Sequence, residues 1–405
     1  MPFRIALSGV NAAQTDLTVT ANNIANVGTN GFKESRAEFA DLYANSRQGV
    51  ARTATGNGVR VANISQQFSQ GNIDFTDNSL DLALSGSGFF VVSDGGARAY
   101  TRAGAFQVDN QGFIVNSDGS RLQGYAPLST GGFNTGGMSD ILITTSESAP
   151  QATTSADVTL NLPSNATVPT TGTFAPGDPT SYTNATSLTV FDSLGAAHTA
   201  TMYFIKDAAP NAWETQLYVD GAAVGTPQAL QYSSTGALTT PANGQVTFPA
   251  YTPATGANPL NMTFDFSTTT QYGDTFGVNA IVQDGFTTGR LIGVNIDQAG
   301  VVQARFTNGR SIPLGQVALA NFPNQQGLQQ LGDTSWSETF ASGQPLLGQA
   351  GNSGFGVLQS GALESSNVDI TEQLVNMITA QRNFQANAQM IQTADQITQT
   401  IINIR

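Results

Sequence analysis

The fold of this chain is decided by its last stretch, Ile370–Arg405, which reads ITEQLVNMITAQRNFQANAQMIQTADQITQTIINIR. The stretch holds neither Gly nor Pro, although the whole chain has 43 Gly and 16 Pro. Its seam residues recur at alternating steps of four and three, which is the spacing of a coiled coil. The seam positions are Ile370, Leu374, Met377, Gln381, Phe384, Ala388 and Ile391, and the stripe then drifts to Ile397 and Ile401. The spacing predicts one long helix with an apolar contact face.

The start and the opposite face of this helix add to the prediction. Ser366 or Asn367 is the expected N-cap, and Asp369 and Glu372 place acidic side chains in the first turn. The opposite face is rich in Gln, Asn and Thr, whereas a solvent-facing helix normally carries many Lys and Glu. This composition favours contact with protein on several sides. A single amphipathic helix that caps one domain is the alternative.

The amino terminus repeats the pattern, again with Gln in the fourth position of the seam. The positions are Phe3, Leu7, Val10, Gln14, Leu17, Ala21 and Ile24. Helices gain little stability from propensity alone, so a heptad helix at each end of the chain needs a partner face. We therefore expect the two ends to pair with each other and to pack their remaining apolar faces against neighbouring copies. The seam positions of both helices form the predicted self-assembly interface.

Signatures at both ends resemble a known family. Near the start, ALSGVNAAQTDL (6–17), ANNIAN (21–26) and GFK (31–33) resemble the N-terminal signature of bacterial flagellar rod and hook proteins. Near the end, GALESSNVD (361–369) and MITAQRNFQANA (377–388) resemble the matching C-terminal signature. The resemblance implies an axial subunit that forms a homopolymer with many copies of itself.

Composition argues against several classes of function. The chain has no Cys, and its single His, His198, is expected at a surface or turn position rather than at a metal site. The net charge is −13 and Lys33 and Lys206 are the only lysines, which argues against nucleic-acid binding. No apolar run approaches the ~20 residues that span a bilayer, and the start lacks the pattern of a secretory signal peptide. No convergent set of acids, bases or nucleophiles is recognisable, so we predict no catalytic residue, no cofactor and no bound metal.

Between the terminal helices the sequence predicts short strands and turns. The expected fold is multidomain and mainly β, with the terminal helices as a coiled-coil-like inner layer and with nested, discontinuous β domains. The predicted parts are a terminal helical domain (1–28 and 366–405), a connector (29–70), an inner β domain (71–145 and 285–365) and an outer inserted β domain (146–284). Strands of the outer domain are expected at 158–162, 187–191, 199–205, 213–219 and 262–266.

The inserted domain separates two candidate functions. Its segment TVFDSLG (189–195) and His198 resemble the outer domain of hook proteins, whereas distal rod proteins resemble the chain ends and lack the insert. We therefore expect a structural subunit of the flagellar hook, a curved hollow tube that acts as a flexible universal joint and transmits torque from rod to filament. A distal rod subunit, part of a rigid drive shaft, is the alternative.

The resemblance also implies partners and a location. The partners are the distal rod protein, the hook cap, the hook–filament junction proteins and the flagellar type III export apparatus. The expected location is the extracellular hook, reached without a cleavable signal peptide. Two other classes have less support, because a β-rich adhesin would not need matched heptads at both ends and an extracellular enzyme would need a convergent site.

Overall fold

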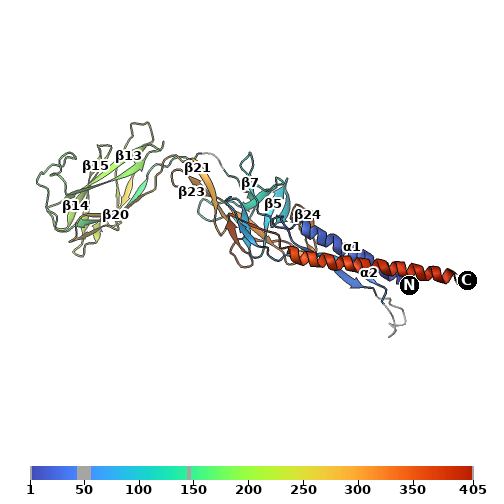
Figure 1. Cartoon of the computed structure of the whole chain (residues 1–405). Coiled ribbons are helices and arrows are strands. Elements are labelled where there is room, and N and C mark those ends of the chain that lie inside the picture. Colours follow the sequence, from blue (N-terminus) through green and yellow to red (C-terminus); the bar gives the residue numbers. More distant parts are fainter. Residues whose placement is uncertain (1, 43–55, 144–146, 404–405) are drawn as a thin grey trace. The chain divides into compact units, whose positions relative to one another are not determined.

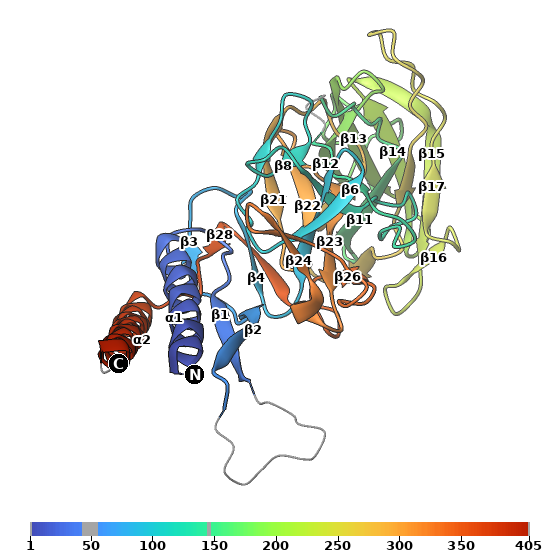
Figure 2. The same ribbon diagram turned by 90° about the vertical axis from the view of Figure 1, so that its right-hand side faces the viewer.

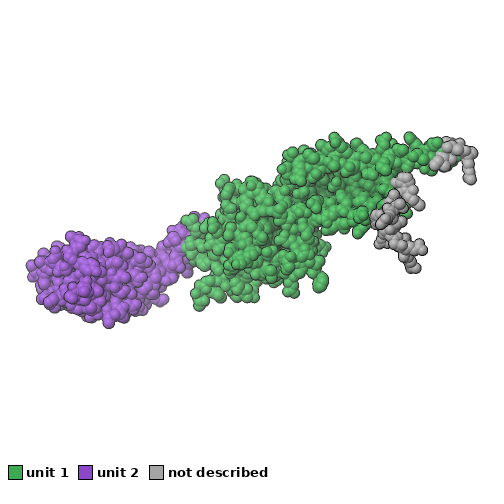
Figure 3. All heavy atoms as spheres, turned by 90° about the horizontal axis from the view of Figure 1, so that it is seen from below, with its two compact units in different colours: residues 1–145, 293–305, 311–405 green, residues 146–292, 306–310 purple. Residues whose placement is uncertain are grey.

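The computed structural model describes residues 2–42, 56–143 and 147–403. The fold is mainly β, with an α-helix at each end of the chain (Figure 1). The chain divides into two compact units (Figure 3). Unit 1 comprises Met1–Thr145, Gly293–Arg305 and Ser311–Arg405, and unit 2 comprises Ser146–Ile292 and Phe306–Arg310.

The two predicted terminal helices are confirmed. The first, α1, spans Pro2–Ala25, and the second, α2, spans Ile370–Asn403. They lie side by side within unit 1 (Figures 1 and 2). The segment after α1 forms a hairpin of β1 (Ser35–Asp41) and β2 (Val59–Gln66), which lies beside α1. The helices and this hairpin together make one end of unit 1. None of the helices described is long and apolar enough to cross a membrane.

The predicted N-cap of α2 is wrong by two or three residues. Asp369 caps the helix, because its Oδ1 accepts hydrogen bonds from the backbone N–H groups of Thr371 (2.7 Å) and Glu372 (3.3 Å). Ser366 Oγ accepts a hydrogen bond from the turn before the helix. The Asn367 side chain binds backbone groups on both sides of the hairpin, so it is not available as a cap.

A large sheet forms the β part of unit 1 and joins distant chain segments. Its strands are β5 (Phe89–Asp94), β6 (Ala97–Thr101), β7 (Gln107–Val108), β8 (Ile114–Val115), β9 (Arg121–Tyr125), β10 (Ser139–Asp140), β21 (Leu291–Ile296), β22 (Val301–Phe306), β23 (Ser311–Asn321), β24 (Gln329–Gly332), β25 (Ser335–Ser337) and β26 (Leu346–Gln349). The main path runs β21-β22-β23-β9-β5-β6-β25-β24, so β23 from the later segment pairs with both β9 and β5 from the earlier one. Edge-to-face contacts among Phe89, Trp336 and Phe322 fill a core on this sheet.

Two short strand pairs connect this sheet region to the helices. β3 (Ile73–Phe75) pairs with β28 (Ala362–Glu364), and β4 (Leu82–Ser85) pairs with β27 (Val357–Ser360). Both pairs bring the chain that leaves the hairpin next to the chain that enters α2. The beginning and the end of unit 1 are thus held together by backbone hydrogen bonds.

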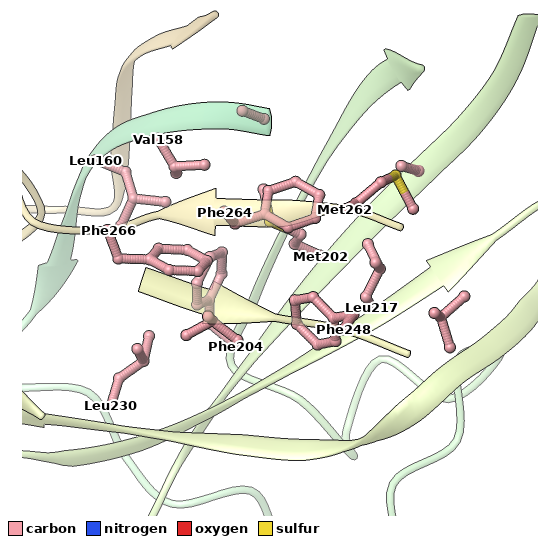
Figure 4. Close-up of a cluster of buried hydrophobic side chains, with 14 of the residues drawn as sticks. Val158, Leu160, Met202, Phe204, Leu217, Leu230, Phe248, Met262, Phe264 and Phe266 are labelled. Carbon is pink, nitrogen blue, oxygen red and sulfur yellow. The ribbon is translucent and has the colours of Figure 1, made fainter. Parts of the chain in front are cut away.

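Unit 2 contains two sheets that share one core. One sheet has the order β12-β13-β14-β15-β16, and the other has β17-β18-β11-β19 with β20 also paired to β11. The bounds are β11 (Ser155–Pro163), β12 (Asn184–Phe191), β13 (Ala197–Lys206), β14 (Ala212–Val219), β15 (Ala222–Tyr232), β16 (Leu238–Thr240), β17 (Gln245–Thr247), β18 (Thr263–Asp265), β19 (Thr270–Tyr272) and β20 (Gly277–Gln283). Side chains from both sheets, among them Leu160, Phe204 and Phe264, meet between them (Figure 4). The strands predicted for this region are confirmed, with shifts of a few residues at their ends.

His198 was predicted at a surface or turn position; it lies just after the turn that precedes β13, but it is buried rather than at the surface. It is 7% exposed and lies between two carboxylates, with Nδ1 2.6 Å from Asp220 Oδ2 and Nε2 3.3 Å from Asp192 Oδ2. Thr255 Oγ1 donates a hydrogen bond to Asp192 as well (2.7 Å), so the cluster joins two β-turns and the loop before β18. Burial would lower the pKa of His198, but the hydrogen bonds to Asp220 and Asp192 outweigh it and raise that pKa. Burial would raise the pKa of Asp192, but its hydrogen bonds outweigh this and lower it to about 2.

The stability of unit 2 is expected to fall as the pH rises above neutrality. A raised folded-state pKa means that protonated His198 contributes fully below the unfolded value of about 6.5 and that this contribution is lost as the pH passes the folded value. The lowered pKa of Asp192 has its effect at acidic pH. The ionised carboxylate stabilises the folded state above about pH 4, and this stabilisation is lost as the pH falls. Urea unfolding followed by Trp213 fluorescence in a Trp336→Phe background measures this. In His198→Gln the alkaline slope should disappear, and an unchanged slope would show that another group titrates.

Candidate self-assembly interface

α1 and α2 approach each other closely through small side chains. A Cβ atom on Gly9 of α1 would collide with the side-chain amide of Asn387 of α2, so a larger residue at position 9 would displace that side chain. Two heptad repeats after Gly9, the Asn23 side chain of α1 donates a hydrogen bond to the Gln373 side chain of α2. Ala380 lies midway between Gln373 and Asn387 on α2 and is 0% exposed. Buried alanines occupy the same stripe of α1, at Ala6 and Ala13.

A buried polar junction fixes the register of the two helices on the hairpin. Asn23 Nδ2 donates to Gln373 Oε1 (3.1 Å) and to the Ser35 carbonyl (2.8 Å), and Ser35 N–H donates back to Asn23 Oδ1 (2.9 Å). Gln373 Nε2 donates in turn to Glu34 Oε1 (2.8 Å). Burial raises the pKa of Glu34, and the hydrogen bond from Gln373 opposes that shift. A buried amide pair has few alternative partners, so it specifies one register of α1 against α2.

A buried charge cluster lies where the helices meet the β part of unit 1. Glu364 accepts from Lys33 Nζ (2.6 Å) and from Arg102 Nη1 (3.0 Å), and the Glu364 and Lys33 side chains are both 0% exposed. Lys33 Nζ also donates to the Ser69 carbonyl, and the Gly71 N–H donates to Glu364 Oε1. Burial lowers the pKa of Lys33, against the attraction of Glu364. The cluster joins segments from both ends of the chain, so it couples the helical pair to the sheet.

The predicted seam lies one residue away from the stripe through which the helices touch. The exposed members of the seam are Phe3, Leu7, Gln14, Ala21, Ile370, Leu374, Gln381 and Ile397. The partly buried members are Val10, Leu17, Ile24, Met377, Phe384, Ala388 and Ile391, and the side chain of Ile401 lies outside the described part of the structure. Small and polar residues therefore make the contact within one chain. Among the large apolar seam residues, Phe3, Leu7, Ile370, Leu374 and Ile397 remain exposed, and the other described ones are partly buried.

Comparisons with known proteins match both chain ends and the middle. Family models match residues 3–33 (Flagella basal body rod protein), 83–190 (Flagellar hook protein FlgE/F/G D1 domain), 161–286 (Flagellar basal body protein FlaE D2 domain) and 359–404 (Flagellar basal body rod FlgEFG protein C-terminal). The flagellar hook protein FlgE of Escherichia coli is 40% identical over 100% of both chains, and that of Borreliella burgdorferi is 33% identical over 98% of each. The chain belongs to the flagellar hook protein family.

A solved hook-protein structure shares the fold. The crystal structure of the flagellar hook protein FlgE2 of Helicobacter pylori matches with a TM-score of 0.54 and 15% identity, over 72% of this chain and 100% of that one. The flagellar hook family is a structural family and not an enzyme family. No group of three or more His, Cys, Asp or Glu that could hold a metal ion occurs among residues 2–42, 56–143 and 147–403.

Sequence reasoning missed the residues that hold the helical pair in place. Lys33 and Glu364 both lie within the signatures that identified the family, but nothing local in the sequence shows that they meet. The scarcity of lysine was the one available signal. A chain with only two lysines does not use them for solubility, which indicates a structural role for each. Lys206, the other lysine, is also buried and donates to three backbone carbonyls.

Proposed function

We propose that this chain is the structural subunit of the flagellar hook and self-assembles into a curved, hollow helical tube. In this proposal, the terminal helical domain (1–28 and 366–405) forms the coiled-coil-like inner layer around a channel. The connector (29–70), the inner β domain (71–145 and 285–365) and the outer inserted β domain (146–284) form successive layers outside it. The tube acts as a flexible universal joint that transmits torque from rod to filament.

The open apolar faces of the two helices carry the proposal. Large apolar side chains that are at least 43% exposed on these helices are Phe3, Leu7, Ile370, Leu374, Val375, Ile378, Met390, Ile397 and Ile402. Fully burying one such side chain is worth about 1.5–3 kcal/mol. Exposed apolar surface does not stabilise a soluble monomer, whereas packing against neighbouring copies buries it. The seam predicted from the sequence supplies many of these residues, which supports its assignment as the self-assembly interface.

Stiffness and flexibility are proposed to come from different parts of the chain. Torsional stiffness needs a closely packed inner layer, and the Gly9–Asn387 contact and the buried Asn23–Gln373 bond supply rigid helix pairing. Bending needs outer contacts that exchange as a subunit passes from the inside to the outside of the curve. The outer domain is rich in Thr, Ser, Gly and Ala and poor in Lys, which suits small interchangeable contacts.

The proposed partners follow from the family. They are further copies of this chain, the distal rod protein, the hook cap, the hook–filament junction proteins and the flagellar type III export apparatus. The proposed location is the hook outside the cell, reached through that apparatus. The match of 161–286 to the FlaE D2 domain model favours the hook over the distal rod, because the rod alternative lacks the insert.

Electron microscopy of polymer grown from the purified chain tests the proposed function. Curved hollow tubes are the expected result. Straight tubes would favour the distal rod alternative, and a chain that stays monomeric under all assembly conditions would contradict the proposal.

Removal of the outer domain is expected to leave polymerisation intact and to change curvature or stiffness. Ser148 pairs with Gly289 and Gln151 with Phe286, so the two ends of the insert lie next to each other and a short Gly-Ser linker can replace it. Tube formation and curvature of the deletion variant are measured by electron microscopy against the full chain. Loss of assembly in a variant whose unit 1 still unfolds cooperatively would contradict the division of roles.

A further inference from the structure

Phe340 is the most exposed large apolar side chain among the described residues. Its relative exposure is 105%, against 76% for the next, Phe75. It belongs to the β24–β25 segment, which we define as residues 325–342: the 3-10 helix η1 (Gln325–Gly327), strands β24 and β25, and the turn that follows. A free aromatic ring of this kind forfeits the stabilisation that burial would give it.

The turn that carries Phe340 is held in a single conformation. Thr339 N–H donates to Ser342 Oγ (2.9 Å), and the N–H groups of Ala341 and Ser342 donate to Thr339 Oγ1 (3.1 and 3.2 Å). Ser342 is 0% exposed. The turn also packs directly on Gly327, where a Cβ would lie 2.4 Å from the Ala341 carbonyl carbon and the Ser342 nitrogen. The ring is therefore presented by a rigid support, which reduces the entropy lost when it is bound.

The rest of the segment is anchored on one side and open on the other. Trp336 is 1% exposed in the core of the sheet, and its Nε1 donates to Gln66 Oε1, which joins β25 to β2. β24 ends the strand order of the sheet, so no strand among the described residues pairs with its outer edge. All four of its residues are exposed, including Leu331 at 58%.

The composition of the segment leaves this edge unprotected. Monomeric proteins commonly place Lys or Pro on an edge strand, which prevents it from pairing with another chain. Residues 325–342 contain no Lys, Pro or Arg. The charged residues present are Asp333 and Glu338, and Glu338 accepts a hydrogen bond from Tyr100 Oη (2.7 Å). An acidic segment without a cation excludes nucleic acid and anionic lipid as occupants. The partner that fits is protein.

We propose that the β24–β25 segment is a docking surface for a second copy of this chain, with Phe340 as its apolar anchor. The inference rests on the proposed function, because in a homopolymer the protein surface that surrounds each subunit is that of other copies. A helical polymer repeats a head-to-tail contact between two different patches, so a projecting ring on one copy meets another surface on the next. Buried aromatic anchors of this kind dominate the energetics of interfaces.

Photo-crosslinking tests the contact directly. The full chain with para-benzoylphenylalanine in place of Phe340 is assembled and irradiated, and linked peptides are identified by mass spectrometry. Crosslinks between copies in polymer but not in dilute monomer are expected. Normal polymer without crosslinks between copies would overturn this inference while leaving the proposed function intact.

A matched pair of variants gives the energetic test. Phe340→Ser is expected to raise the critical concentration for assembly by about tenfold or more, whereas Phe340→Leu, which keeps an apolar anchor, should change it by less. Because the ring is fully exposed in the monomer, both variants should keep the wild-type unfolding curve. Equal critical concentrations for Ser, Leu and wild type would overturn the inference, and a wild-type chain that never assembles would overturn the proposed function as well.

Discussion

Leu374→Asp is expected to abolish polymerisation and to leave the monomer folded. Leu374 is 47% exposed on α2, so the substitution removes no core contact within the chain. In the proposed polymer the same position is buried between copies, where an unpaired carboxylate costs several kcal/mol. Every subunit of the polymer carries the substitution, so every copy of this contact is weakened. We therefore expect the critical concentration for assembly to rise by about 100-fold or more.

Sedimentation of assembled material against monomer concentration measures this effect. Leu374→Met is the matched control, because it keeps an apolar side chain of similar size and should assemble nearly as the wild type does. Circular dichroism and urea unfolding of the monomer verify that Leu374→Asp leaves the fold unchanged. Normal assembly of the Asp variant would show that this face of α2 is not an interface between copies.

Glu364→Gln is expected to destabilise unit 1 by about 3–5 kcal/mol, because it leaves two buried cations without a counter-charge. Glu364 bonds both Lys33 and Arg102, and all three side chains are at most 5% exposed. Gln keeps the size of the side chain and some of its hydrogen bonds, so the decrease in the free energy of unfolding measures the effect of removing the charge. The effect should be confined to the unit that contains the cluster.

Unfolding followed separately in the two units tests this prediction. Trp336 reports on unit 1 and Trp213 on unit 2, and replacing either one by Phe isolates the other signal. Glu147→Gln provides the control, because the Glu147–Arg290 pair has side chains 62% and 83% exposed and should contribute no more than about 1 kcal/mol. Equal losses for the buried and the exposed pair would contradict a structural role for the cluster.

Local pattern predicted the two helices and many of the strands, but it did not predict which strands pair, and it gave loops where β24, β25, β26 and β27 form. The heptad spacing predicted both helices, because periodicity is a property of neighbouring residues. It placed the seam one residue away from the stripe that joins α1 to α2, because the large apolar residues dominate the pattern while Gly9 and Ala380 make the close contact. The N-cap prediction failed for a related reason: Asn367 is a good capping residue, but the hairpin occupies its side chain.

A helix at each end, a β-rich middle and membership of the flagellar axial proteins could all be predicted from the chain alone, since they follow from periodicity and contiguous signatures. The contact of Lys33 with Glu364 and the position of His198 between Asp192 and Asp220 are visible in the folded chain only. Pairings of this kind depend on how distant segments are brought together, and residues 331 positions apart carry no local mark of their contact. The open apolar faces of α1 and α2 became visible in the same way, once the helices were seen to pair through their small residues.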